Sequence, residues 1–140
     1  MASNAARVVY LDASAIVKLV VREKETDDLI GYLGDAEPVS SEIAEVEVLR
    51  AVYLKTGAEE SIARAEAVLR RFSLVALDDE LRRDAARARP ADLRSLDAIH
   101  LASCLRLAKQ LDAVVVYDRR LADALRATSI RVDAPSGNGN

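Results

Sequence analysis

The chain has 140 residues, of which 51% are hydrophobic and 31% are charged, and its formal net charge is −3. This length and composition allow one buried core and a soluble surface, which excludes a disordered protein, a disulfide-stapled miniprotein and a large multidomain enzyme. The acidic balance argues against nucleic-acid binding, but arginine far outnumbers lysine among the 20 basic residues, and a bound metal would cancel some carboxylates.

The cellular setting and domain limits follow from a few further features. Cys104 is the single cysteine, so an intramolecular disulfide is excluded and a reducing, cytoplasmic location is expected. No apolar run approaches the roughly 20 residues of a membrane span, and the first residues do not resemble a signal peptide. We expect one domain over residues 1–134 and a disordered tail over 135–140.

The first half of the chain predicts strands that alternate with helices. Residues 8–11 form a short apolar run that stops at Asp12, as expected of a strand buried on both faces. In chain order we then expect a helix capped by Ser14, a helix over about 25–33 closed by Gly34, a strand over 37–40, and a helix from Ser40 or Ser41 to about Lys55, closed by Gly57.

The second half continues this alternation. In chain order we expect a helix over 59–72, a strand over 73–77, a helix capped by Asp78 or Asp79 that ends before Pro90, a helix from a cap at Ser95 to about Gln110, a strand over 113–117, a helix over 119–127 and a strand over 130–132. The pattern indicates right-handed crossovers and an α/β fold with a central, mainly parallel sheet of about 4–5 strands covered on both faces.

Two aspartates follow the two clearest strands, Asp12 after residues 8–11 and Asp118 after residues 113–117. Ligands of such folds bind beyond the carboxyl ends of the strands, where the strand order reverses. Taken singly, each aspartate is better explained as a turn former or a helix N-cap than as part of a site.

Two further acids lie on helical faces that look apolar. Asp97 has a structural explanation, because the first turn of a helix favours an acid, yet its face continues through core-like residues, namely Leu101, Cys104 and Ala108. Glu47 lies in mid-helix, on a face shared with Ile43, Ala51 and Leu54. Spacing slightly favours Glu47 over Glu45 and does not exclude Glu45, whereas Glu42 is explained as a first-turn acid.

If these acids converge, their mutual repulsion requires relief. A divalent cation provides it, and an all-oxygen ligand set suits Mg²⁺ or Mn²⁺, which support phosphodiester cleavage by an activated water. Protonation or pairing with arginine is the alternative and would make the cluster structural.

Four segments together carry a family resemblance: VYLDASA at 9–15, SEIAEVEVLRA at 41–51, LDAIHLA at 96–102 and VYDRRL at 116–121. In this order they resemble a PIN-domain ribonuclease, most closely the VapC toxins of type II toxin–antitoxin pairs. The resemblance covers residues 8–132 and implies a three-layer α/β/α fold and Mg²⁺- or Mn²⁺-dependent RNA cleavage.

The resemblance also implies roles for single residues. Asp12, Glu47, Asp97 and Asp118 match the family's acidic site, which favours Glu47 over Glu45, and Ser14 matches a supporting hydroxyl residue. A small antitoxin and a dimer of toxin chains are the implied partners. The sequence departs from the family at Val116, where many members carry Thr or Ser and therefore a hydroxyl that can bind ligands or phosphate.

Several other residues have two interpretations each. His100, one turn past Asp97, is either a general base or, more simply, a packed partner of the site. Arg119 and Arg120 lie at a helix start that suits RNA phosphate, or else on a solvated face. Cys104 is expected in the core. A basic cluster is either plain surface or an RNA path; it comprises Arg82, Arg83, Arg87 and Arg89.

Two other functions compete with a nuclease. An aspartate-based phosphatase or receiver domain would also place an acid after its first strand, but Asp12-Ala13-Ser14 lacks the second aspartate of the former, and arginines rather than lysine follow Asp118. A non-catalytic PIN-like domain that binds RNA or protein is supported by Val116 and opposed by the presence of all four acids.

Overall fold

The computed structural model describes residues 6–136, and their strands form one five-stranded sheet in the order β3-β2-β1-β4-β5. Every neighbouring pair of strands is parallel. The strands are β1 (Val8–Leu11), β2 (Glu37–Ser41), β3 (Ser73–Val75), β4 (Ala113–Val115) and β5 (Val132–Asp133). The expected parallel sheet is therefore confirmed, although the strands expected over 73–77 and 113–117 end earlier.

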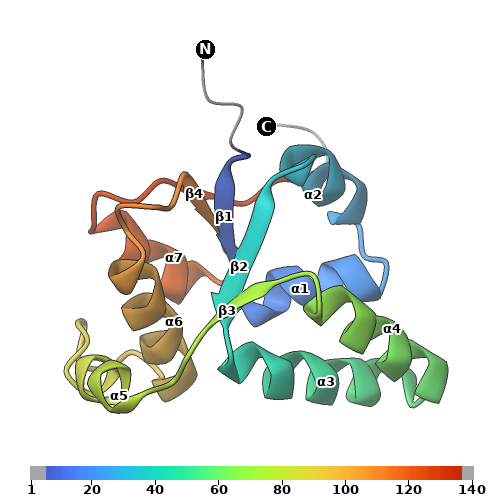
Figure 1. Ribbon diagram of the computed structural model, residues 1–140, viewed down its shortest axis with the longest axis horizontal. Coiled ribbons are helices and arrows are strands. Elements are labelled where there is room, and N and C mark those ends of the chain that lie inside the picture. The colour runs from blue at the N-terminus through green and yellow to red at the C-terminus, as the bar shows by residue number, and fades with distance from the viewer. Residues whose placement is uncertain (1–5, 137–140) are drawn as a thin grey trace.

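Helices cover both faces of this sheet (Figure 1). They are α1 (Ala13–Val20), α2 (Thr26–Leu33), α3 (Ile43–Thr56), α4 (Glu59–Leu69), α5 (Asp79–Ala86), α6 (Ser95–Arg106) and α7 (Arg119–Arg126). Figure 1 shows α5, α6 and α7 on one side of the strands and α1, α3 and α4 on the other. The predicted three-layer α/β/α class is confirmed.

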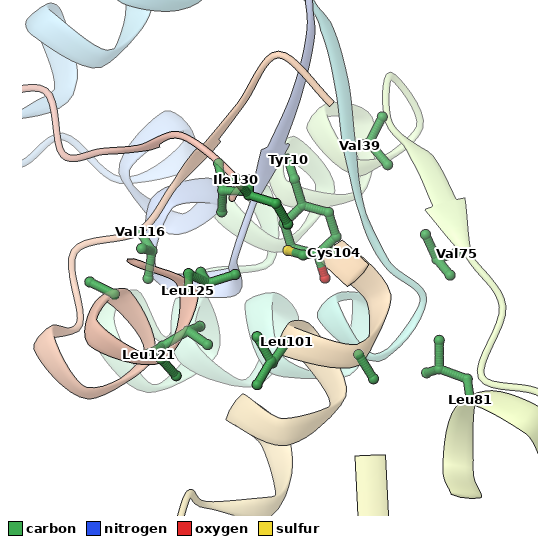
Figure 2. Packing of buried hydrophobic residues seen from close by; sticks show 14 residues of the cluster. Tyr10, Val39, Val75, Leu81, Leu101, Cys104, Val116, Leu121, Leu125 and Ile130 are labelled. Atoms are coloured by element: carbon green, nitrogen blue, oxygen red, sulfur yellow. The ribbon is translucent and has the colours of Figure 1, made fainter. Parts of the chain in front are cut away.

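Alternation along the strands divides the buried side chains between two cores. Val9 and Leu11 of β1 join the core that contains residues of α1 to α4, whereas Tyr10 points into the core beside α5, α6 and α7. Figure 2 shows the second core, in which Tyr10 of β1 reaches toward α6. The side chains of a strand alternate between the two faces of the sheet. Tyr10 therefore lies on the face covered by α5, α6 and α7, and α6 carries Asp97 and His100.

Three aspartates start helices in the same way. Asp12, Asp78 and Asp118 each accept a hydrogen bond from the backbone N–H three residues on, at 3.0, 2.9 and 3.0 Å respectively. Such caps satisfy backbone donors that the first helical turn leaves without partners. A cap by Asp78 rather than Asp79 was one of the two predicted options.

Three predicted caps are wrong. Ser14 lies inside α1 and donates its hydroxyl to Asp12, which is the actual cap. The helix expected to start from Ser40 or Ser41 has Glu42 as its N-cap residue.

Ser95 is the first residue of α6, whose N-cap, Arg94, makes no side-chain cap bond.

Two further predictions concern membrane spans and the C-terminal tail. Among residues 6–136, no helix combines the length and apolar character that a membrane crossing requires. Of the tail expected to be disordered, residues 137–140 lie outside the described residues.

Candidate metal-dependent nuclease site

The site lies at the carboxyl edge of β1 and β4, which are neighbours in the sheet. From β1 the chain proceeds to β2 and β3 on one side, and the sheet continues from β4 to β5 on the other. The order thus reverses between β1 and β4, which is where parallel sheets leave a crevice for ligands. Asp12 follows β1 directly and Asp118 follows β4 three residues on, as the sequence predicted.

Asp12 is a buried carboxylate, with only 6% of its surface exposed. Its Oδ1 accepts hydrogen bonds from the Ala15 N–H at 3.0 Å and the Ser14 hydroxyl at 2.9 Å. Burial raises the pKa of Asp12, and the negative charge of Glu47 raises it further, whereas a protonated His100 and the two donors lower it. An ionised Asp12 is therefore costly unless a cation lies near it.

Asp118 lies on the exposed rim of the same edge. Its Oδ1 accepts the N–H of Leu121 at 3.0 Å and so caps α7. The capping explanation is thus correct for Asp118 as it is for Asp12. It does not exclude a role in the site, because a carboxylate has several further acceptor positions.

Asp97 connects the other acids electrostatically. It lies in the first turn of α6 and is half-buried. Burial raises the pKa of Asp97, and the negative charges of Asp118 and Glu47 raise it further. A protonated His100 and Arg94 lower it. Asp12 after β1, Glu47 in α3, Asp97 in α6 and Asp118 after β4 therefore lie within electrostatic reach of one another.

Glu47, rather than Glu45, belongs to this environment. Glu45 is exposed, whereas Glu47 is half-buried and its Oε1 lies 2.7 Å from Nε2 of His100. The predicted apolar face of α3 is wrong, since Leu54 is 87% exposed. The buried face consists of Ala44, Val48 and Val52, and Glu47, three residues after Ala44, lies beside it.

His100 is buried among these residues and bonded on both ring nitrogens. Nδ1 lies 2.7 Å from the Tyr10 hydroxyl and Nε2 lies against Glu47. Of the two interpretations from sequence, the structure favours a packed partner over an accessible base. Sequence analysis did not single out Tyr10, although a tyrosine in a buried aliphatic strand needs a partner for its hydroxyl.

The remaining residues singled out from the sequence lie as follows. Arg119 and Arg120 are exposed at the start of α7, next to Asp118. Cys104 is buried, as expected, and burial raises its pKa well above the usual value. Val116 is 1% exposed and belongs to the core beside α7, near Leu121 in Figure 2, so its side chain serves packing.

The acid cluster lacks cationic partners from the protein. Among residues 6–136, no lysine or arginine is paired with Asp12, Asp97 or Asp118, and the one ionic contact of Glu47 is with His100. Arginine pairing, the structural alternative for this cluster, is therefore absent from the described part of the chain. A set of carboxylate oxygens that form no ion pair with lysine or arginine suits a hard divalent ion.

The acids do not form a complete metal cage in this structure. Within residues 6–136, no group of three or more His, Cys, Asp or Glu side chains is arranged so that it could hold a metal ion. Mg²⁺ usually keeps several waters and takes only one or two carboxylates directly.

The chain is similar in sequence to known proteins over most of its length. The family model of the PIN domain matches residues 9–126. Ribonuclease VapC46 of Mycobacterium tuberculosis is 42% identical over 129 residues, which cover 91% of this chain and 98% of that protein. Ribonuclease VapC35 of the same species is 38% identical over 133 residues, which cover 91% and 97%.

Solved structures share the fold at low sequence identity. Mycobacterium tuberculosis VapC20, described as a Sarcin-Ricin loop cleaving toxin, gives a TM-score of 0.67 at 14% identity and covers 83% of this chain and 94% of its own. A toxin-antitoxin complex from Klebsiella pneumoniae gives 0.67 at 16% identity, covering 91% and 97%.

Proposed function

This chain belongs to the PIN-domain family, among the VapC ribonucleases, and on that basis we propose that it is an endoribonuclease toxin dependent on Mg²⁺ or Mn²⁺. The observation that carries the proposal is the cluster of four acids from separate parts of the fold, Asp12, Glu47, Asp97 and Asp118. The charge of Glu47 raises the pKa of Asp12, and the charges of Asp118 and Glu47 raise the pKa of Asp97. The cytoplasmic location expected from the sequence is part of this proposal.

Each acid would have a defined part in cleavage. Asp12 and Asp97, the more buried aspartates, would hold the cation, and Glu47 and Asp118 would hold it directly or through water. When bound, the cation supplies a more acidic water and neutralises charge on phosphate. Ser14 keeps Asp12 in place by its hydroxyl bond, and Arg119 and Arg120 would contact the RNA backbone.

The test compares variants of the acid cluster with a control variant in an RNA cleavage assay. Asp12→Asn and Glu47→Gln are each expected to lower cleavage at least about 100-fold, because charge stabilisation at the reacting phosphate is lost. Glu45→Gln, on the same helix but exposed, is the matched control and should cleave normally. Cleavage should stop with EDTA and return with Mg²⁺ or Mn²⁺.

Other outcomes would identify the competing functions. Equal cleavage by wild type and Asp12→Asn would show a contaminating nuclease or another site. A phosphoenzyme on Asp12 would favour the phosphatase. RNA binding without cleavage under any metal would favour the non-catalytic domain.

We also propose a small antitoxin as the partner, as in the toxin–antitoxin complexes that share the fold. An apolar surface suits this contact, since Val46, Tyr53 and Leu54 of α3 are more than half exposed. A groove of about 700 Å³ between α3 and α4 adjoins them. The dimer of toxin chains stays a prediction from the resemblance.

A further inference from the structure

A buried chain of hydrogen bonds leads from the core to the acid cluster. The Tyr10 hydroxyl of β1 lies 2.7 Å from Nδ1 of His100 in α6, and Nε2 of His100 lies 2.7 Å from Oε1 of Glu47 in α3. Tyr10 and His100 are 0% and 2% exposed, and their rings meet edge to face at 5.8 Å. Figure 2 shows the Tyr10 side chain within the core, reaching from β1 toward α6.

We propose that His100 is a positioning residue for Glu47, set by Tyr10, and that it fixes one carboxylate oxygen so that the other serves the cation site. This inference rests on the proposed function. It assigns His100 no contact with substrate and no proton transfer during the reaction.

The hydrogen-bond pattern defines the form of the ring. An ionised Glu47 oxygen only accepts, so Nε2 of His100 carries a hydrogen. Burial raises the pKa of Tyr10 well above its usual value, so its hydroxyl keeps its proton. In the proposed arrangement this hydroxyl donates to Nδ1 and the ring carries its one hydrogen on Nε2, because a partner on one ring nitrogen selects the tautomer.

A neutral donor suits a cation site better than lysine or arginine would. The contact from Nε2 of His100 restricts the half-buried side chain of Glu47, which could otherwise change rotamer on the helix surface. It does so without cancelling the negative charge that attracts the cation. Residues that orient a metal-binding carboxylate in this way typically change metal affinity 10–100-fold when they are removed.

The ring can be observed directly because His100 is the only histidine. In untagged protein labelled with ¹⁵N-histidine, the spectrum at neutral pH without metal should show one ring, protonated on Nε2 and not on Nδ1. Tyr10→Phe should move part of the population to the Nδ1-protonated form. A wild-type ring protonated on Nδ1, or on both nitrogens, would overturn the proposed arrangement.

Mn²⁺ affinity, measured by electron paramagnetic resonance, tests the role. His100→Ala should weaken binding about 10–100-fold, and His100→Gln, whose amide can still donate to Glu47, should recover most of it. In a Glu47→Gln background, His100→Ala should add no further loss. Cys104→Ala, which removes a buried side chain of the same core, is the control for loosened packing and should bind normally.

The outcomes separate this role from the function on which it rests. Equal Mn²⁺ binding by wild type and His100→Ala would overturn the positioning role alone. A full additional loss in the Glu47→Gln background would also overturn it, since His100 would then act through another group. Absence of Mn²⁺ binding by the wild type would overturn the proposed function, and the role with it.

Discussion

Asp12 combines two roles that are usually considered alternatives for an aspartate after a strand. One oxygen caps α1 through the Ala15 N–H, and the buried carboxyl group also lies in the field of Glu47. Capping stabilises the helix start, whereas ionisation of the buried group opposes folding. Without a cation, Asp12 therefore lowers stability at neutral pH while it fixes the geometry of the edge.

We therefore expect Asp12→Asn to be more stable than the wild type without metal and less stable than the wild type with metal. Because the pKa of Asp12 is raised above its unfolded value of 3.8, its favourable contribution is full below that value and is lost as pH rises through the folded pKa. Asp12→Asn keeps a capping side chain without the buried charge, so at pH 7 with EDTA the variant should be more stable than the wild type. Urea unfolding measures this difference.

With Mg²⁺ present the wild type should gain stability and Asp12→Asn should not. A ligand at about 100 times its Kd adds about 2.7 kcal/mol to the state that binds it, and only the wild type is expected to receive this gain in full. The same Mg²⁺-induced gain in both proteins would show that Asp12 does not contribute to the cation site.

The residues of the site differ in how far sequence could identify them. Asp12 and Asp118 follow from their strands, but Glu47 and Glu45 differ by only two positions on one helix. The apolar face chosen for α3 is wrong because exposed Leu54 was counted as core. The contact between Tyr10 and His100 joins residues 90 positions apart, and no local pattern reports such a contact.

Among the helices and strands, ends set by backbone geometry were predicted better than ends set by packing. Gly34 and Gly57 close α2 and α3 with φ of 51° and 62°, which glycine adopts at little cost. By contrast, β3 and β4 end before their apolar runs do. Val116 lies beyond the last residue of β4 yet stays in the core, so hydrophobicity continues where the strand has ended.

The carboxylate of Asp78 contributes to the stability of two helices, α5 and α6. It caps α5 through Leu81, and its two oxygens accept from both terminal nitrogens of Arg106 in α6, at 2.9 and 3.0 Å. These contacts, that of Arg106 foremost, lower the pKa of Asp78 to about 2. Because this pKa is depressed, the contribution is present above the unfolded value of 3.8 and is lost as pH falls toward 2.

The corresponding variants should rank in a fixed order at pH 7. Wild type should exceed Asp78→Asn, which keeps the cap and loses the ion pair, and Asp78→Ala, which loses both, should be least stable. The gap between wild type and Asp78→Asn should close near pH 2. Equal stability of these two at pH 7 would mean that this exposed pair contributes nothing, as many exposed pairs do.

For the protein as a unit, local charge matters more than the net charge of −3. Arg119 and Arg120 adjoin the acid cluster, and arginine binds phosphate in a two-pronged geometry. Replacing both with glutamine should weaken binding of single-stranded RNA and reduce the slope of log K against log salt by about 1 for each lost phosphate contact. Filter binding at several salt concentrations measures both quantities.

A variant of equal net charge provides the control. Arg83 and Arg87, exposed on and just after α5, are replaced in the same way. Unchanged binding by this control would place the phosphate contacts at the start of α7. An equal loss in both variants would instead favour the basic cluster as an RNA path, or a merely long-range effect of charge.

The pairing of β1 with β4 has a consequence for how the protein is made. Val9 pairs with Ala113. One neighbour of β1, β2, is made soon after it, but the other, β4, is made only after most of the described residues have been synthesised. Asp12 and Asp118 come together only at that stage. Under the proposed function, a chain truncated before Asp118 lacks one of the four acids and is expected not to cleave RNA.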